Sequence, residues 1–206
     1  MQNNYIFLDI DGVLNHNKFY QERATSKKEL RKAVIKAEQT KENKLEYYKS
    51  NIDCTGSLLL INKLVEETNS IVICSSSWRS DGIEKLNEIF EYCGATFKFT
   101  DVTPHLNYKY DDKYHSCPRG TEIEWYLRHM LNFSHINWSK EKQQEQMIKS
   151  NVKNYIIIDD DSDMLYTQRN HFIHVLPSPR NNSGFNPAYY ETALNTLSKD
   201  ILTLNY

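Results

Sequence analysis

The apolar positions of the chain form short continuous runs, and amphipathic stretches lie between them. Three runs of four or five mostly apolar residues lead directly into polar clusters, at 5–8, 70–74 and 155–158. Such runs are typical of strands that are buried on both faces of a parallel sheet. Weaker runs at 96–99 and 171–176 predict two further strands.

Between the predicted strands, apolar residues recur at helical spacing. Helices are predicted at about 26–48, 58–68, 86–93, 121–127, 140–149 and 187–204. Thr121 and Glu124 have the spacing of a capping box, which places Arg119 just before a helix N-terminus. Residues 103–117 are predicted to form a loop. The alternation of strands and helices predicts an α/β fold with a parallel sheet.

The length and charge indicate one domain without a strong electrostatic preference. At 206 residues, the chain is expected to form a single domain, 1–206, with a helical basic insert at about 15–53. Its 25 basic and 27 acidic residues give a formal charge of −2, which does not point to nucleic acid or to an anionic membrane. Residues 18–49, however, contain ten Lys or Arg and five Glu. This local excess fits either recognition of an anionic substrate or a solvated helical face.

A cytosolic location is expected from the termini and the cysteines. The first four residues lack a basic region, and no apolar run approaches the roughly 20 residues that span a bilayer. The cysteines Cys54, Cys74, Cys93 and Cys117 form no C-x-x-C pair. Neither a disulfide framework nor a zinc site is therefore expected.

Polar clusters at three predicted strand ends carry candidate chemistry. They are Asp9 and Asp11, Ser75 and Ser76, and Asp159 and Asp160. Because parallel strands end at one edge of a sheet, where α/β proteins bind ligands, we expect the clusters to converge there. Several carboxylates would repel each other unless a cation neutralised them, and Mg²⁺ prefers such oxygen ligands. With serine hydroxyls and the guanidinium of Arg119 to hold phosphate oxygens, this convergence predicts a phosphoryl-transfer site.

The motifs resemble those of a known superfamily. Residues 9–14 read Asp-Ile-Asp-Gly-Val-Leu and resemble the D-x-D-G-x-[TVL] signature of the haloacid dehalogenase (HAD) superfamily of phosphatases. Ser75, Arg119 and the run at 156–160 resemble its second, third and fourth motifs, in the same order. The resemblance implies a three-layer Rossmann-like HAD fold. Its central, mostly parallel sheet would carry helices on both faces, and no large cap domain is expected.

A narrower resemblance concerns small members of the superfamily. It rests on three segments, Ser-Ser-Ser-Trp-Arg at 75–79, Val-Thr-Pro at 102–104 and Arg-Gly-Thr-Glu-Ile at 119–123. Some of the members that these segments resemble are associated with RNA repair. Members without caps have open sites and tend to act on macromolecules, so a phosphorylated macromolecule is the expected partner.

The resemblance implies a role for each site residue. Asp9 would be the nucleophile that forms an aspartyl-phosphate, and Asp11 would protonate the leaving group and then activate water. Ser75 and the backbone N–H of Ser76 would hold phosphoryl oxygens, and Arg119 would neutralise negative charge.

The resemblance also implies a Mg²⁺ site. The ion would bind the carboxylate of Asp9, the backbone carbonyl of Asp11 and an acid of the fourth motif. For that acid, Asp159 with Asp160 fits the D-D form of the motif, whereas Asp159 with Asp163 fits its D-x-x-x-D form. The D-D pair is preferred because it follows the predicted strand directly.

Several nearby residues leave alternatives open. Lys109 and Lys113 are rivals for the third-motif cation, and histidines near the motifs are expected on the surface. Those histidines are His16, His105 and His115.

Trp78 and Arg79 are candidate substrate contacts. Trp78 would stack on an aromatic or base substrate, or else anchor the core. Arg79 would contact substrate or form a structural ion pair. Cys74 lies one residue too close to Arg79 for the Cys-x5-Arg loop of cysteine phosphatases, so a buried thiol is expected there.

The substrate class is the least determined property. The preferred expectation is a Mg²⁺-dependent phosphomonoester hydrolase that acts on a phosphoprotein, with phosphotyrosine as one candidate. The alternative is a phosphatase of 3′ or 5′ nucleic-acid ends in RNA or DNA repair. A third reading, a non-catalytic HAD-like binding domain, is disfavoured by the intact acids.

Overall fold

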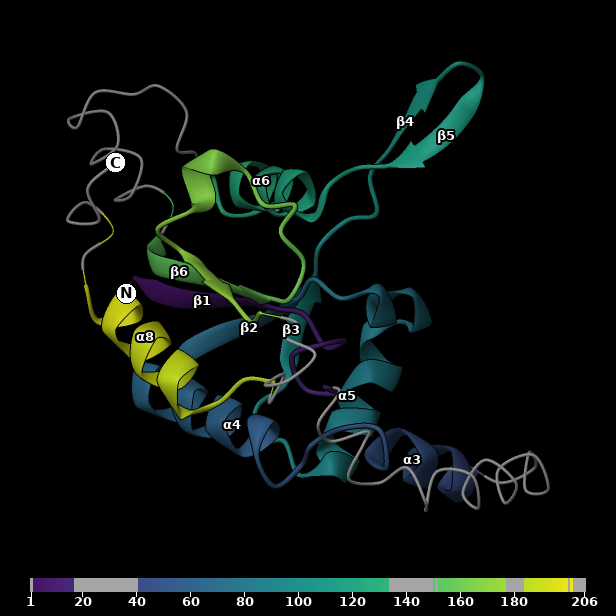
Figure 1. Ribbon diagram of the computed structural model, residues 1–206, viewed down its shortest axis with the longest axis vertical. Coiled ribbons are helices and arrows are strands. Elements are labelled where there is room, and N and C mark those ends of the chain that lie inside the picture. Colours follow the sequence, from purple (N-terminus) through teal and green to yellow (C-terminus); the bar gives the residue numbers. More distant parts are fainter. Residues whose placement is uncertain are drawn as a thin grey trace.

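The computed structural model describes residues 2–16, 41–133, 150, 152–176, 184–199 and 201 of the protein (Figure 1). The helix predicted at 140–149 and most of the helix predicted at 26–48 lie outside these residues. The described end of the helix predicted at 26–48 forms α3 (Lys41–Lys49). Within the described ranges, every helix is too short or too polar to cross a membrane.

Five parallel strands form the central sheet, in the order β3-β2-β1-β6-β7 (Figure 1). They are β1 (Asn3–Leu8), β2 (Ser70–Cys74), β3 (Phe99–Val102), β6 (Val152–Asp159) and β7 (Phe172–His174). β1 lies at the centre, where Leu8 is opposite Cys74 of β2 and Ile158 of β6. The three strands that lead into polar clusters therefore end side by side, and the predicted parallel α/β sheet is confirmed.

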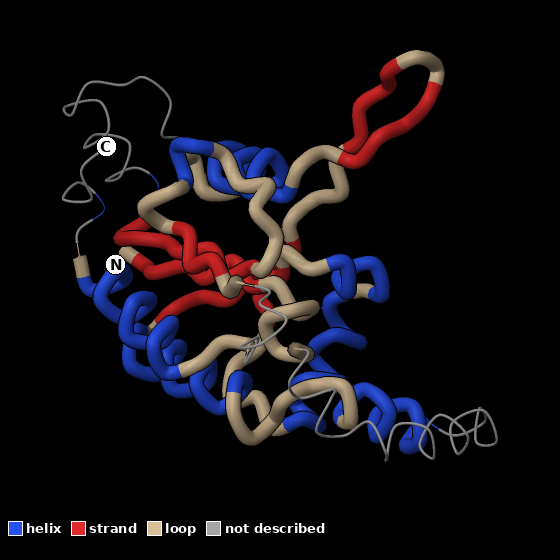
Figure 2. The backbone as a smooth tube through the Cα atoms, viewed as in Figure 1, coloured by secondary structure: helices blue, strands red, loops and turns tan. Residues whose placement is uncertain are grey.

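Helices cover both faces of this sheet (Figure 2). Successive strand residues point to opposite faces, so both faces of these apolar strands must be covered. Ile6 and Leu8 of β1 belong to the apolar core on one face. That core contains α4 (Ser57–Thr68), α5 (Ile83–Cys93) and α8 (Pro187–Ser198). Phe7 faces the other way, and its ring meets Tyr126 of α6 (Arg119–His129) edge-on at 5.7 Å. The predicted three-layer arrangement is confirmed, and the described residues contain no large cap domain.

The two ends of the predicted insert meet at one point on the domain. The backbone N–H of Asp53 donates to the carbonyl of Leu14 at 2.7 Å. The carboxylate of Asp53 accepts the backbone N–H groups of Gly56 and Ser57, each at 3.0 Å, at the start of α4. It also pairs with His16, with 3.2 Å between Nε2 and Oδ2. A surface position was predicted for His16, but the residue is buried because it joins the beginning of the insert to its end.

Residues 103–117 do not form the predicted loop throughout. They contain an antiparallel hairpin of β4 (Asn107–Tyr110) and β5 (Lys113–Ser116), which stands out from the body of the protein (Figure 1). Its turn residues Asp111 and Asp112 have φ of 47° and 56°, a left-handed conformation that Asp tolerates. The loop prediction was wrong because every residue of the two strands is exposed, so no apolar face marks them.

α6 also begins earlier than predicted, at Arg119. The capping-box pair Thr121 and Glu124 lies inside the helix instead of at its start. The backbone N–H of Arg119 donates to the carboxylate of Asp163 at 2.7 Å. A carboxylate from the segment after β6 therefore supplies the cap that the sequence pattern placed at Thr121.

Candidate active site

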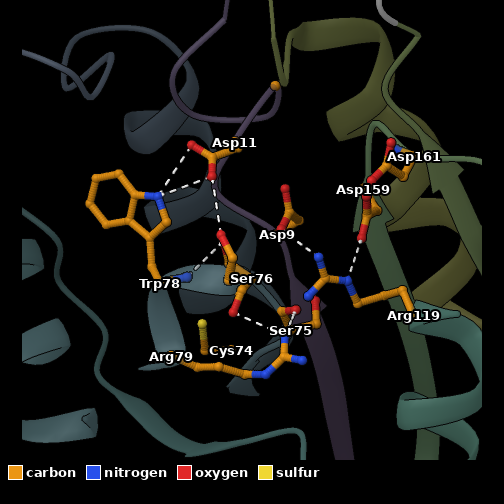
Figure 3. Close-up of polar contacts among 12 residues, drawn as sticks. Asp9, Asp11, Cys74, Ser75, Ser76, Trp78, Arg79, Arg119, Asp159 and Asp161 are labelled. Atoms are coloured by element: carbon orange, nitrogen blue, oxygen red, sulfur yellow. Dashed lines mark hydrogen bonds and ion pairs between the residues drawn. The ribbon is translucent and has the colours of Figure 1, made fainter. Parts of the chain in front are cut away.

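The carboxyl ends of β1, β2 and β6 bring the predicted clusters together (Figure 3). The strand ladder continues into the site, because the N–H of Asp9 donates to the carbonyl of Ile158 at 2.9 Å. The N–H of Ser75 donates to the carbonyl of Leu8 at 3.0 Å on the other side. The side chains at these positions are buried, and backbone hydrogen bonds of a sheet edge fix their spacing.

Three carboxylates form an acidic group at this edge. Asp9, Asp159 and Asp160 each offer one oxygen, and these oxygens lie within 4.8 Å of one another. Burial raises the pKa of the Asp9 carboxyl well above its usual range, and the nearby Asp159 carboxyl raises it further, against the opposing effect of Arg119. Burial raises the pKa of Asp159 to about 7, although a backbone hydrogen bond from Asp161 and the charge of Arg119 lower it. Burial and the mutual repulsion of the acids therefore disfavour full ionisation of the group unless a cation joins it.

The acidic group fits a divalent cation with hard oxygen ligands. The Oδ2 atom of Asp159 is buried and accepts no hydrogen bond from the described residues. Gly12 has a φ of 75°, and a Cβ atom at this position would overlap the carboxylate of Asp160. The glycine of the D-x-D-G motif thus lets Asp160 approach the strand end. Oxygen ligands of this kind suit Mg²⁺.

Arg119 is the cation that faces the acidic group (Figure 3). Its Nη2 atom lies 3.7 Å from Oδ1 of Asp9, and its Nε atom lies 3.7 Å from Oδ2 of Asp159. The rival Lys109 pairs instead with Asp112 on the hairpin, at 2.8 Å. The other rival, Lys113, is exposed on β5. Of the three candidates for the third-motif cation, Arg119 is the one placed against the acids.

Asp163 is positioned differently from Asp160. Its carboxylate caps α6 through the backbone N–H of Arg119. Asp160, in contrast, belongs to the acidic group with Asp9 and Asp159. The geometry therefore favours the D-D form of the fourth motif.

The loop after β2 presents serine groups and is held by Arg79. The hydroxyl of Ser75 is buried and has no hydrogen-bond partner among the described residues. The guanidinium of Arg79 donates to the backbone carbonyls of Ser75 and Ser76, the latter at 3.0 Å. It also pairs with Glu122 of α6 at 2.5 Å, and the Arg79 side chain is only 3% exposed. This arrangement favours the structural ion pair over contact with substrate.

Asp11 is exposed, but three side chains hold its carboxylate. Asn15 Nδ2 donates to Oδ1 at 2.5 Å, and Trp78 Nε1 lies 3.2 and 3.1 Å from the two oxygens. Ser77 Oγ donates to Oδ2 at 3.4 Å. The indole ring of Trp78 rests against Tyr48 of α3, with 5.5 Å between ring centroids. Trp78 is also partly buried against the apolar core, as one of its two sequence interpretations expected, and its indole N–H holds Asp11 in addition.

The thiol of Cys74 lies beneath these groups and is buried. Burial raises its pKa to about 12, so the thiol stays protonated at neutral pH. A thiolate nucleophile is therefore disfavoured, in line with the sequence spacing. No disulfide joins the four cysteines, all of which lie in the described part of the chain.

Asn15, His105 and Glu122 were not predicted to support the site. Asn15 is four residues after Asp11 in the turn that follows the first motif, but nothing in its spacing marks it as a partner. His105 is exposed, as expected, and its Nδ1 atom lies 3.0 Å from Nη2 of Arg79. Glu122 pairs with a residue 43 positions away, which no sequence pattern indicates.

A parallel sheet with an aspartate at the end of its central strand, a serine loop beside it, and an arginine and two acids opposite defines the class of HAD-type phosphatases. Residues 5–181 match the family described as the HAD domain in Swiss Army Knife RNA repair proteins, and the chain belongs to this family. Comparison with curated proteins and with solved structures found no significant match. Membership confirms the superfamily predicted from the motifs and implies hydrolase or phosphatase activity in general.

Proposed function

We propose that the protein is a Mg²⁺-dependent phosphomonoesterase that removes a phosphate from the end of a nucleic-acid strand, in the context of RNA repair. The observation that carries this proposal is the buried carboxylate of Asp9, which shares the guanidinium of Arg119 with Asp159. The neighbouring strand end carries the hydroxyl of Ser75, which has no hydrogen-bond partner among the described residues. The family description names RNA repair proteins, which supports a nucleic-acid substrate. It gives no support to the preference for a phosphoprotein.

In the first step, a carboxylate oxygen of Asp9 attacks phosphorus and the ester bond to the leaving oxygen breaks. Asp11 donates its proton to that oxygen, so the product leaves as a neutral hydroxyl. The hydroxyl of Ser75 and the guanidinium of Arg119 bind the other phosphoryl oxygens. Asn15 and Trp78 keep the carboxyl of Asp11 in place for the transfer.

In the second step, water attacks phosphorus and Asp11 accepts the proton that the water loses. The bond between phosphorus and Asp9 breaks, and inorganic phosphate leaves. Asp9, Asp159 and Asp160 are the carboxylates that would hold Mg²⁺, together with the backbone carbonyl of Asp11. When bound, this ion would neutralise the acidic group and draw the anionic substrate to it.

The catalytic part of the proposal is tested with an aryl phosphate. The wild-type protein should hydrolyse it with Mg²⁺ and lose activity with EDTA. Asp9→Asn should be inactive, because an amide does not attack phosphorus, and circular dichroism should show an unchanged fold. Cys74→Ser is the matched control, and it should remain active. Activity that survives Asp9→Asn, or that disappears in Cys74→Ser, would contradict the mechanism.

The substrate class is tested by a direct comparison of two kinds of substrate. RNA and DNA oligonucleotides with a 3′ or 5′ phosphate are compared with phosphotyrosine and phosphoserine peptides at equal concentration, and released phosphate is measured. A higher kcat/KM on oligonucleotides supports the proposal. A higher kcat/KM on peptides would contradict the proposal and favour a phosphoprotein phosphatase.

A further inference from the structure

The hairpin of β4 and β5 exposes an unusual number of aromatic side chains. Tyr108, Tyr110 and Tyr114 are 50%, 71% and 78% exposed. Large aromatic side chains normally bury most of their surface, so three of them on one short hairpin need an explanation. A two-stranded ribbon has no core of its own to fill with them.

The register of the hairpin sorts these residues onto two faces. Tyr108 is opposite His115, and Tyr110 is opposite Lys113. Because side chains alternate along a strand, these four residues share one face, here named the tyrosine face. Tyr108 and His115 stack at 5.4 Å with an angle of 23° between their rings. Tyr114 lies on the opposite face.

The hairpin is attached at both ends to the candidate active site. It follows β3, whose carboxyl end shares the sheet edge with that of β1, and it leads through residues 117–118 into Arg119. Its ends are joined by a hydrogen bond from the N–H of Cys117 to the carbonyl of Leu106, at 2.9 Å. The N–H of Leu106 donates to Glu122 at 3.0 Å, and Glu122 pairs with Arg79. The ion pair that holds the serine loop thus also anchors the hairpin.

We infer that the tyrosine face binds unpaired nucleotides of the strand whose terminal phosphate occupies the active site. This inference rests on the proposed function and adds the surface that holds the substrate. Flat aromatic rings with polar edges stack on any base, which gives affinity without sequence preference. The hairpin edge would follow the strand away from its end, and the active site would hold the phosphate.

The charges of the hairpin fit this occupant. Lys113 stands on the tyrosine face beside Tyr110, where it can contact a phosphate of the backbone. The acids of the hairpin, Asp111 and Asp112, lie in the turn, and Asp112 is paired with Lys109. The face therefore presents aromatic rings and positive charge together, the combination that single-stranded nucleic acid requires.

The size of the hairpin sets the length of strand it would bind. Each strand has four residues, which span about 13 Å at ~3.3 Å per residue. About four stacked nucleotides cover this length at ~3.4 Å each. A terminal mononucleotide should therefore gain little from the hairpin, whereas longer strands should gain progressively and then level off.

The test measures binding and turnover separately. In the Asp9→Asn background, fluorescence anisotropy gives the Kd of a labelled single-stranded oligonucleotide of about ten nucleotides with a terminal phosphate. Adding Tyr108→Ala and Tyr110→Ala should raise this Kd about tenfold or more, since stacking on a tyrosine is lost at two positions. Tyr114→Ala, an equally exposed tyrosine on the other face, should change it less than about twofold.

Two comparisons decide the result. The double variant Tyr108→Phe with Tyr110→Phe keeps both rings and should retain the Kd of the Asp9→Asn protein. It therefore distinguishes loss of stacking from unfolding of the hairpin in the alanine variant. With Asp9 intact, the alanine variant should lose more kcat/KM on the oligonucleotide than on an aryl phosphate. Three results would overturn the inference: equal losses of affinity from substitutions on both faces, a loss of affinity in the phenylalanine variant, or an unchanged Kd in the alanine variant. An unchanged Kd would point to a protein partner for the tyrosine face. An inactive wild-type protein with normal oligonucleotide binding would instead refute the proposed function alone.

Discussion

Glu122→Gln should destabilise the protein strongly, because it removes the charge partner of a buried guanidinium. The pair of Arg79 and Glu122 has side-chain exposures of 3% and 6% and a separation of 2.5 Å. Removing one member of a buried ion pair leaves the other charge uncompensated, at a cost of roughly 3 to 5 kcal/mol. Glutamine keeps the volume and an acceptor for the N–H of Leu106, so about 3 kcal/mol is expected.

Urea denaturation followed by circular dichroism measures this loss. Asp81→Asn is the matched control, because Asp81 pairs with Lys85 at 2.6 Å with both side chains about half exposed. An exposed pair of this kind adds little to stability, so the control should leave the free energy of unfolding almost unchanged. Equal effects from the two variants would refute the argument from burial. Glu122→Gln should also raise KM for an aryl phosphate, because Arg79 holds the serine loop.

Three other predictions concern the site and the core. Trp78→Phe removes the contact of the indole N–H with Asp11 while keeping an aromatic ring, so kcat for an aryl phosphate should fall about tenfold with little change in KM, as steady-state kinetics would show. Gly12→Ala should abolish activity and weaken Mg²⁺ binding in calorimetry, since the new methyl group displaces the carboxylate of Asp160. Burial lowers the pKa of His171 to about 4. Its contribution to stability is therefore complete above the unfolded pKa of about 6.5 and is lost as pH falls toward 4, by about 3 kcal/mol in denaturation experiments.

The convergence of the site could be predicted because each part depends on a local pattern. A buried strand is marked by its own apolar residues, and a parallel sheet places the ends of β1, β2 and β6 at one edge. Asp9 and Ser75 follow their strands directly and Asp159 is the last residue of β6, so strand assignment alone brings them together. The structure shows this arrangement.

Other features depend on contacts that no local pattern records. The side chain of Arg79 is buried because Glu122, on a helix far away in the sequence, compensates its charge. Trp78 meets Asp11 only after the loop beyond β2 folds against the first motif. The hairpin escaped prediction for the opposite reason, since strands exposed on both faces need no apolar alternation.

Trapping the covalent intermediate tests the central claim most directly. The wild-type protein is mixed with Mg²⁺ and an RNA oligonucleotide that carries a terminal phosphate, and the reaction is quenched in acid within one turnover. Mass spectrometry should then find one phosphoryl group on Asp9, which hydroxylamine removes as expected for an acyl phosphate, and none on the Asp9→Asn protein. Release of phosphate from the oligonucleotide with no phosphoryl group on Asp9 at any time within that turnover would contradict the claim.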